Sequence, residues 1–157
     1  MRLSAREEYG LRCLLYLARA APDASVTIGE IAKAESLTEA NVAKLMRLLR
    51  QAGLVKSMRG RKGGYTLTTP PERLSVSRIV DAVGERLRHA CDCGRFSGLG
   101  ERCVHGDDCA MRGLFAGIDQ MVHRFLSGWT LADLMAPEGE VSDRIERRAP
   151  RNDPAET

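Results

Sequence analysis

Four of the five cysteines of this 157-residue chain lie within nineteen residues, at Cys91, Cys93, Cys103 and Cys109. The stretch between them is rich in glycine and charged residues and poor in residues that form a core. Such a segment cannot become ordered by burying apolar surface, because too little of that surface is available to offset the lost chain entropy. We therefore expect a bound metal or a disulfide bond to order it.

The overall composition predicts a cytoplasmic protein without a membrane-spanning segment. Hydrophobic residues make up 43% of the chain, which is enough for a core. No run approaches the roughly eighteen consecutive apolar residues of a membrane helix. Charged residues interrupt the apolar ones over residues 1–20, as on an amphipathic helix and unlike a signal peptide. Because stable disulfide bonds are uncommon in the cytoplasm, clustered cysteines there more often bind metal or respond to redox conditions.

Positive charge is concentrated in the first half of the chain. Residues 1–69 contain twelve basic and six acidic side chains, whereas residues 70–157 contain twelve and fifteen. Between Ala40 and Pro71 there are seven basic residues and no acidic one. A local field of one sign favours a polyanionic partner, although an exposed basic face without a partner would have the same composition.

Capping residues and apolar spacing divide the chain into short elements. The spacing predicts helices over residues 4–21, 27–34 and 38–52, with a turn at 36–37. Strands are expected over 54–58 and 65–68 around the glycine-rich residues 59–64, then helices over 75–87 and 110–127 and a last helical turn at 130–134. Residues 137–157 are charged and lack apolar periodicity, so we expect a disordered tail.

This order of elements is that of a winged helix-turn-helix, a mainly α-helical fold with a two-stranded wing. In such folds the second helix of the pair presents its N-terminal residues to base edges in the major groove of double-stranded DNA. The expected DNA-binding residues on helix 38–52 are Thr38, Ala40, Asn41, Lys44 and Arg47. Asn41 can pair with adenine, Lys44 can reach guanine or a phosphate, and Arg47 is placed for a phosphate.

The tip of the expected wing carries three cations, Arg59, Arg61 and Lys62, among three glycines. Glycine lets the backbone approach a sugar-phosphate wall closely, and an arginine there could enter the minor groove, where the negative potential is enhanced. A tight hairpin with surface charges would have the same sequence. Because the helix pair, the wing and the acid-free stretch coincide, we predict nucleic-acid binding.

Helix 110–127 carries an apolar stripe that is too long for one small partner, formed by Leu114, Phe115, Ile118, Met121, Val122, Phe125 and Leu126. Packing on its own domain is one explanation, but we expect self-association into a homodimer. The chain is thus predicted to contain a DNA-binding domain (1–87), a cysteine-rich loop (88–109), a long C-terminal dimerisation helix with its following turn (110–136) and the tail (137–157).

The order of several short motifs resembles the Rrf2 family of bacterial transcription regulators, which includes the iron–sulfur cluster assembly regulator and the nitric-oxide-sensing repressor. The matching segments are MRLS at 1–4, YGLR at 9–12, LLYLA at 14–18, IGEIA at 28–32, VAKLM at 42–46, GLVKS at 53–57 and, most diagnostic, RGRKGGYTL at 59–67. The resemblance covers about residues 1–135. It implies a homodimer with crossing long helices that binds a roughly palindromic operator.

The resemblance also implies an iron–sulfur cluster, of 4Fe–4S or 2Fe–2S type, at the cysteines. Members that bind clusters typically have three cysteines about five residues apart, and Cys103 and Cys109 fit the last two. Cys91 and Cys93 lie farther upstream than this pattern, so either or both can supply the first ligand. Some members use a carboxylate from the first helix of the other subunit as a further ligand, and the matching residue here is Glu8.

The cysteine spacing leaves alternatives to the cluster open. Zinc is possible, although the single-residue gap between Cys91 and Cys93 is awkward for two ligands on one ion. Glu8 also has the position of an exposed carboxylate paired with Arg12 on the same helix. We predict a regulator that senses redox state, nitric oxide or iron–sulfur status, or alternatively a repressor with a thiol–disulfide switch or a zinc site. Without a nucleotide-binding or catalytic motif, we expect no enzyme activity.

Overall fold

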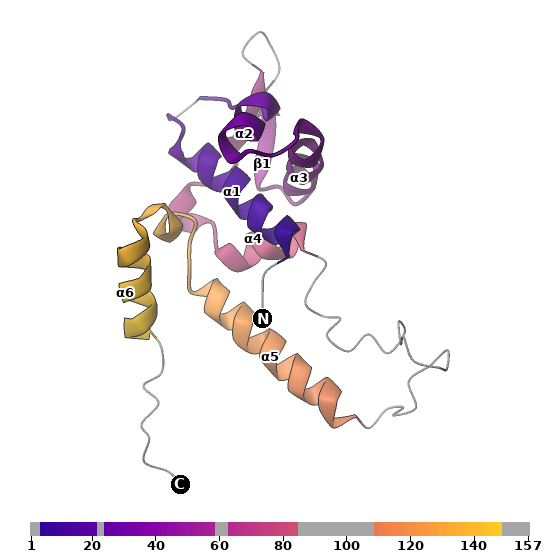
Figure 1. The fold of residues 1–157 in the computed structure, drawn as a ribbon, viewed down its shortest axis with the longest axis vertical. Helices are drawn as coiled ribbons and strands as arrows, with labels where there is room; N and C mark the ends of the chain where they lie inside the picture. The colour runs from indigo at the N-terminus through magenta and orange to yellow at the C-terminus, as the bar shows by residue number, and fades with distance from the viewer. Residues whose placement is uncertain (1–3, 22–23, 59–62, 85–108, 149–157) are drawn as a thin grey trace, which may run out of the picture.

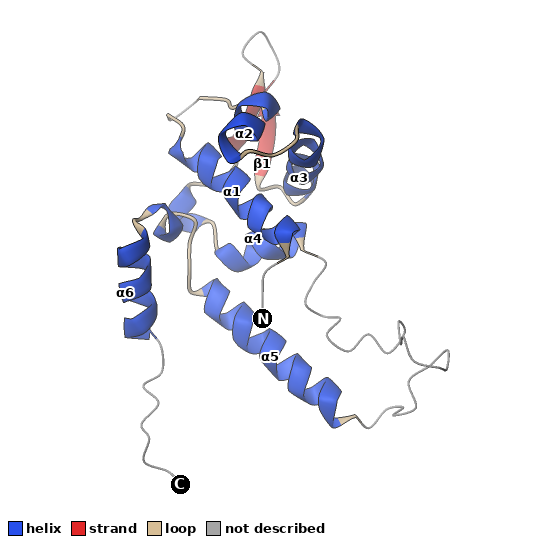
Figure 2. Ribbon diagram, in the orientation of Figure 1, coloured by secondary structure: helices blue, strands red, loops and turns tan. Residues whose placement is uncertain are grey.

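The computed structural model describes residues 4–21, 24–58, 63–84 and 109–148. Six α-helices and one two-stranded antiparallel sheet make up this part of the chain (Figures 1 and 2). In order they are α1 (Ala5–Arg19), α2 (Ile28–Glu35), α3 (Glu39–Gln51), β1 (Val55–Met58), β2 (Gly64–Leu67), a 3-10 turn η1 (Pro71–Arg73), α4 (Val76–Val83), α5 (Ala110–Ser127), a second 3-10 turn η4 (Asp133–Met135) and α6 (Glu138–Arg148). The predicted winged helix-turn-helix is confirmed.

Side-chain caps define where the first helices begin. The Ser4 hydroxyl accepts from the Glu7 amide while the Glu7 carboxylate accepts from the Ser4 amide, and Thr27 and Glu30 repeat this reciprocal pair at α2. Thr38 caps α3. Each cap satisfies a backbone donor that the first turn of a helix leaves without a partner. The left-handed residue Ser36, at φ 54°, turns the chain from α2 into α3.

The core of the winged domain lies between α1, α3 and α4. Its fully buried side chains include Leu14 of α1, Met46 and Leu49 of α3, and Ile79 of α4. Gly10 allows α1 and α4 to approach closely, since a Cβ there would lie 2.8 Å from Val83 Cγ2. Helix α3 therefore packs directly against both α1 and α4.

The wing is joined to the body by a third segment of extended chain. Met58 of β1 pairs with Gly64 of β2, and Tyr65 exchanges two backbone hydrogen bonds with Val26, at 3.0 and 2.8 Å. A Cβ on Gly64 would lie 2.6 Å from the Val26 carbonyl oxygen. Only glycine fits at this crossing, because the obstacle is backbone, which cannot rotate away as a side chain can.

Replacing Gly64 with alanine is expected to lower the free energy of unfolding by about 1–3 kcal/mol through this overlap. Urea denaturation followed by circular dichroism would measure it. Gly139→Ala in α6 is the control, because a Cβ there meets nothing within 4 Å and the residue lies outside the apolar stripe of α5. That change should instead stabilise the helix by up to about 1 kcal/mol. Equal stabilities of Gly64→Ala and the parent protein would contradict the close packing described.

The long helix α5 projects from the body as an arm (Figure 1). None of its residues is buried, and the chain re-enters the core only after it, at Trp129 and Leu131, which are 3% and 0% exposed. Residues 129–131 thus pack with the winged domain, although the sequence grouped them with the dimerisation helix. None of the helices within the described ranges is long and apolar enough to cross a membrane.

The prediction of a disordered tail from residue 137 is wrong for its first half. Residues 138–148 form α6. The segment contains only two apolar side chains, Val141 and Ile145, so its sequence has no apolar stripe that would predict a helix. Val141 packs against the core, and two polar contacts add to it: Arg144 pairs with Asp133 at 2.7 Å, and the Arg148 guanidinium lies 4.9 Å from the centre of the Trp129 ring. Residues 149–157 lie outside the described ranges.

Candidate nucleic-acid interface and cysteine site

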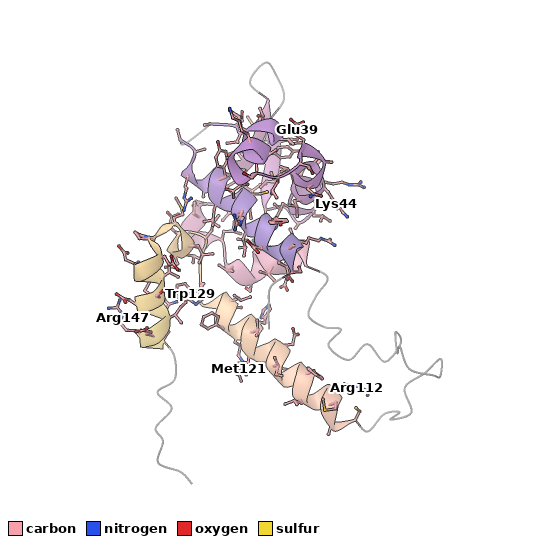
Figure 3. The ribbon with its side chains drawn as sticks, in the orientation of Figure 1. Glu39, Lys44, Arg112, Met121, Trp129 and Arg147 are labelled. Carbon is pink, nitrogen blue, oxygen red and sulfur yellow. The ribbon has the colours of Figure 1, made fainter. Side chains whose placement is uncertain are left out.

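The predicted DNA-binding residues of α3 share its outer face. Thr38, Ala40, Asn41, Lys44 and Arg47 are all exposed, whereas the inner face of the helix is buried in the core. The Asn41 amide donates to Thr38 Oγ1 at 3.3 Å, which fixes the first turn. Figure 3 shows Lys44 on the outer side of α3. An amide and two cations are therefore presented together to solvent.

A pocket of about 230 Å³ separates this face from the start of α1. Asn41, Lys44 and Leu45 line one side, and Ala5, Arg6 and Tyr9 line the other. The first turn of α1 thus borders the exposed face of α3. A polyanion lying against α3 would also meet this turn.

Glu39, the first residue of α3, was not among the predicted DNA-binding residues. It is exposed and lies next to Ala40 and Asn41 (Figure 3). A carboxylate at this end of a recognition helix can accept a hydrogen bond from the amino group of cytosine. Its position directly after the cap Thr38 marks it in the sequence, although its charge is opposite to that of the predicted cationic contacts.

Three of the predicted DNA contacts belong to the tip of the wing. Arg59, Arg61 and Lys62 lie outside the described residues. The strands on either side of them are described, and Lys56 and Met58 of β1 are exposed. The strands of the wing, at 55–58 and 64–67, lie within one residue of those predicted at 54–58 and 65–68.

Cys109 is the one cysteine of the cluster within the described ranges. It is half-buried, carries a free thiol and occupies the N-cap position of α5, where its side chain makes no capping hydrogen bond. Its carbonyl accepts from the Arg112 amide at 3.0 Å. Because Cys91, Cys93 and Cys103 are outside those ranges, the described residues alone contain no group of three potential metal ligands.

Cys13 lies apart from this site, in the core. It is fully buried, and burial, followed by the negative charge of Glu35, raises the pKa of its thiol to about 12. A thiol with this pKa remains protonated at neutral pH, and metals bind the thiolate. Cys13 therefore acts as a small apolar side chain of the core.

Glu8 has the pairing that its sequence position suggested as an alternative to metal binding. Its Oε1 accepts from Arg12 Nη2 at 2.8 Å and from Arg12 Nε at 3.1 Å, and both side chains are half exposed. Pairs of this kind along a helix contribute only about 0.3–0.5 kcal/mol. Glu8 also lines a groove of about 390 Å³ between α1 and α6. The carboxylate is accessible, and little free energy holds it to Arg12.

Comparison with known proteins decides the family. The Rrf2 family profile, described as an iron-dependent transcriptional regulator, matches residues 3–137. The chain belongs to the Rrf2 family. The regulator IscR of Yersinia enterocolitica is 31% identical over 162 aligned positions, which span 100% of this chain and 96% of that protein. Because both the family profile and IscR are described as transcriptional regulators, the chain is a transcriptional regulator and not an enzyme.

Two solved structures of Rrf2 regulators resemble this one closely. CymR, the global cysteine regulator of B. subtilis, is 29% identical with a TM-score of 0.65, over 86% of this chain and 96% of that one. The oxidised form of Staphylococcus aureus CymR is 26% identical with a TM-score of 0.65, over 87% of this chain and 98% of that one.

Proposed function

We propose that this Rrf2 regulator binds a pseudo-palindromic operator as a homodimer in the cytoplasm and senses redox state, nitric oxide or iron–sulfur status through a cluster at its cysteines. The observation that carries the DNA-binding part is the outer face of α3, where Asn41, Lys44 and Arg47 are exposed on one side. Glu39 adds a hydrogen-bond acceptor for cytosine. Arg59, Arg61 and Lys62 of the wing would contact the backbone or the minor groove.

The exposed stripe on α5 supports the homodimer. Apolar side chains recur at intervals of alternately three and four residues, at Met111, Leu114, Ile118, Met121 and Phe125, and are 37–66% exposed. This interval is that of a helix seam that packs against a second helix. An exposed seam of this length is costly in water unless it is covered. A second copy of α5 would cover it, and the winged domains of the two protomers would then face the two half-sites of the operator.

The residues at the cysteine site suit an iron–sulfur cluster. Cys109 stands where the N-terminus of α5 carries partial positive charge, a favourable place for thiolate ligands and the negative charge of a cluster. Glu8 is accessible and weakly paired, as an exchangeable ligand from the other subunit must be. A bound cluster would supply a centre that changes with oxidation or with nitric oxide. The remaining ligands would be Cys91, Cys93 and Cys103. Glu8 would connect the winged domain of one subunit to the cysteine-rich loop of its partner.

A thiol–disulfide switch or a zinc site is the second candidate for the same cysteines. The oxidised form recorded for the related S. aureus regulator supports the thiol switch. Four clustered cysteines satisfy either chemistry, and DNA binding through α3 is common to all three. Colour distinguishes them, because protein with a cluster is brown and protein with zinc or a disulfide is colourless.

Cys109→Ser is expected to lower bound iron and sulfide at least about tenfold, because it removes a thiolate ligand. Anaerobic purification followed by metal and sulfide analysis and an absorption spectrum would measure the loss. Cys13→Ala is the matched control and should keep its iron, since Cys13 is buried in the core. A colourless parent protein that contains zinc would contradict the cluster and support the second candidate. Unchanged DNA affinity after complete loss of the cluster would contradict sensing through it.

A further inference from the structure

The direction of α5 is set at a short joint. The chain between Gly128 and Leu131 connects the helix to the winged domain, and two backbone hydrogen bonds fix it there. Val76 N donates to Trp129 O at 2.9 Å, and Leu131 N donates to Leu74 O at 2.8 Å. Along the helix itself most contacts with the winged domain are polar and partly exposed, as between His123 and Asp81 at 3.3 Å, and the apolar contact is that of Leu126, which packs against the core next to the joint. The joint therefore carries most of the constraint on where the arm points.

Two arginines on one face of α6 hold this joint. Arg148 Nη1 donates to the carbonyl of Gly128, the residue that ends α5, at 2.7 Å, and its guanidinium lies over the Trp129 ring. Arg144 binds Asp133 Oδ1 at 2.7 Å, while Asp133 Oδ2 accepts from the Thr130 amide at 2.9 Å. The Thr130 amide is the main cause of a lowered pKa at Asp133, so this carboxylate stays ionised for Arg144.

We propose that α6, through Arg144 and Arg148, is a positioning element that sets the angle between α5 and the winged domain and thereby the operator spacing that the dimer accepts. This inference rests on the proposed function. It concerns a helix that begins beyond residue 137, where the match to the family profile ends. Helix α6 lies on the opposite side of the winged domain from α3 (Figure 1), so neither arginine is a candidate for base contact.

The length of α5 makes a small change at the joint large at the far end. Its 18 residues span about 27 Å at 1.5 Å per residue, so a rotation of about 10° would move that end by roughly 5 Å. Successive base pairs are about 3.4 Å apart. The distance between the two half-sites of an operator must match the distance between the two winged domains of the dimer. A dimer with a loosened joint would therefore bind operators of more than one spacing.

Fluorescence of Trp129, the single tryptophan of the chain, tests the contact without DNA. Arg148→Ala is expected to raise the acrylamide quenching constant about two- to threefold, because the guanidinium no longer covers the ring. Arg147→Ala is the matched control: it removes the same charge one residue away, and Arg147 donates to Asp143 O within α6. Equal quenching in the two variants would overturn the role of Arg148.

Operator spacing tests the consequence. Duplexes selected from a random library with the parent protein would be compared with the same duplexes carrying one base pair more or less between half-sites. The parent should prefer its own spacing about tenfold or more. Arg148→Ala and, as a second variant, Arg144→Ala should reduce this preference at least about threefold, whereas Arg147→Ala should retain it.

The outcomes separate this inference from the function on which it rests. An unchanged spacing preference in both Arg148→Ala and Arg144→Ala, with the parent binding normally, would overturn the positioning role alone. If the parent protein selects no DNA, or selects DNA without any preference for half-site spacing, the proposal that it binds an operator as a homodimer is overturned, and the positioning role of α6 with it. Circular dichroism of each variant confirms that it is folded before it is compared.

Discussion

Met121→Glu in α5 is expected to convert the homodimer to a monomer and to weaken operator binding by about 100-fold or more. Met121 is 66% exposed at the middle of the apolar stripe. In a symmetric dimer the substitution brings two carboxylates into one apolar seam, and each buried charge without a partner costs several kcal/mol. Sedimentation equilibrium would report the mass, and gel shifts with a selected operator would report affinity.

Gln120→Glu is the control for this prediction. It adds the same charge to the adjacent residue, which faces away from the stripe along the helix. We expect this variant to remain dimeric with nearly unchanged operator affinity. A Met121→Glu protein that sediments as a dimer would contradict the proposed use of α5, and the stripe would then need a different partner.

Substitutions on the outer face of α3 are expected to have the next largest effect and to separate base contacts from phosphate contacts. Asn41→Ala should lower operator affinity by about 10- to 100-fold and relax sequence preference, because an amide paired with a base contributes about 1–3 kcal/mol of discrimination. Arg47→Ala should weaken binding to all sequences alike and reduce the slope of log affinity against log salt by about two, one contact in each protomer.

Titrations of specific and scrambled duplexes at several salt concentrations would measure both quantities. Lys44→Ala belongs with Asn41 if Lys44 binds guanine and with Arg47 if it binds phosphate, so the same titration assigns its role. Arg78→Ala, an exposed cation on α4, is the control for lost charge and should leave sequence preference unchanged. Equal loss of affinity for both duplexes with Asn41→Ala would contradict base recognition by α3.

The helix pair and the wing could be predicted from the sequence because their signals are local. The caps Thr27 and Thr38 each bond to a backbone amide three residues away, so their sequence spacing predicted where α2 and α3 begin. Gly53 has φ 71°, as expected of the residue that follows a helix and turns the chain into a strand. Long helix α5 occupies residues 110–127, as its apolar periodicity predicted.

Helix α6 and the division of the α5 stripe could not be predicted in the same way. Leu126 packs against the core, while Phe115 and Val122 are half-buried and Leu114, Ile118, Met121 and Phe125 remain exposed. The sequence showed one stripe because periodicity reports which residues share a helix face and not what covers it. Contacts of α6 join Arg148 to Trp129 and Gly128, about twenty residues away, and no local pattern marks such a pair.

The sequence by itself determined the family, the order of the helices and strands in the winged helix-turn-helix, and the clustering of four cysteines in one segment of the chain. These follow from bonds between near neighbours and from residue types whose chemistry is fixed. Only the tertiary structure decided that Cys13 is sealed in the core, that Glu8 is held loosely by Arg12, and that α6 returns to the root of the arm. Burial and orientation depend on segments far apart in the chain, and folding alone brings these together.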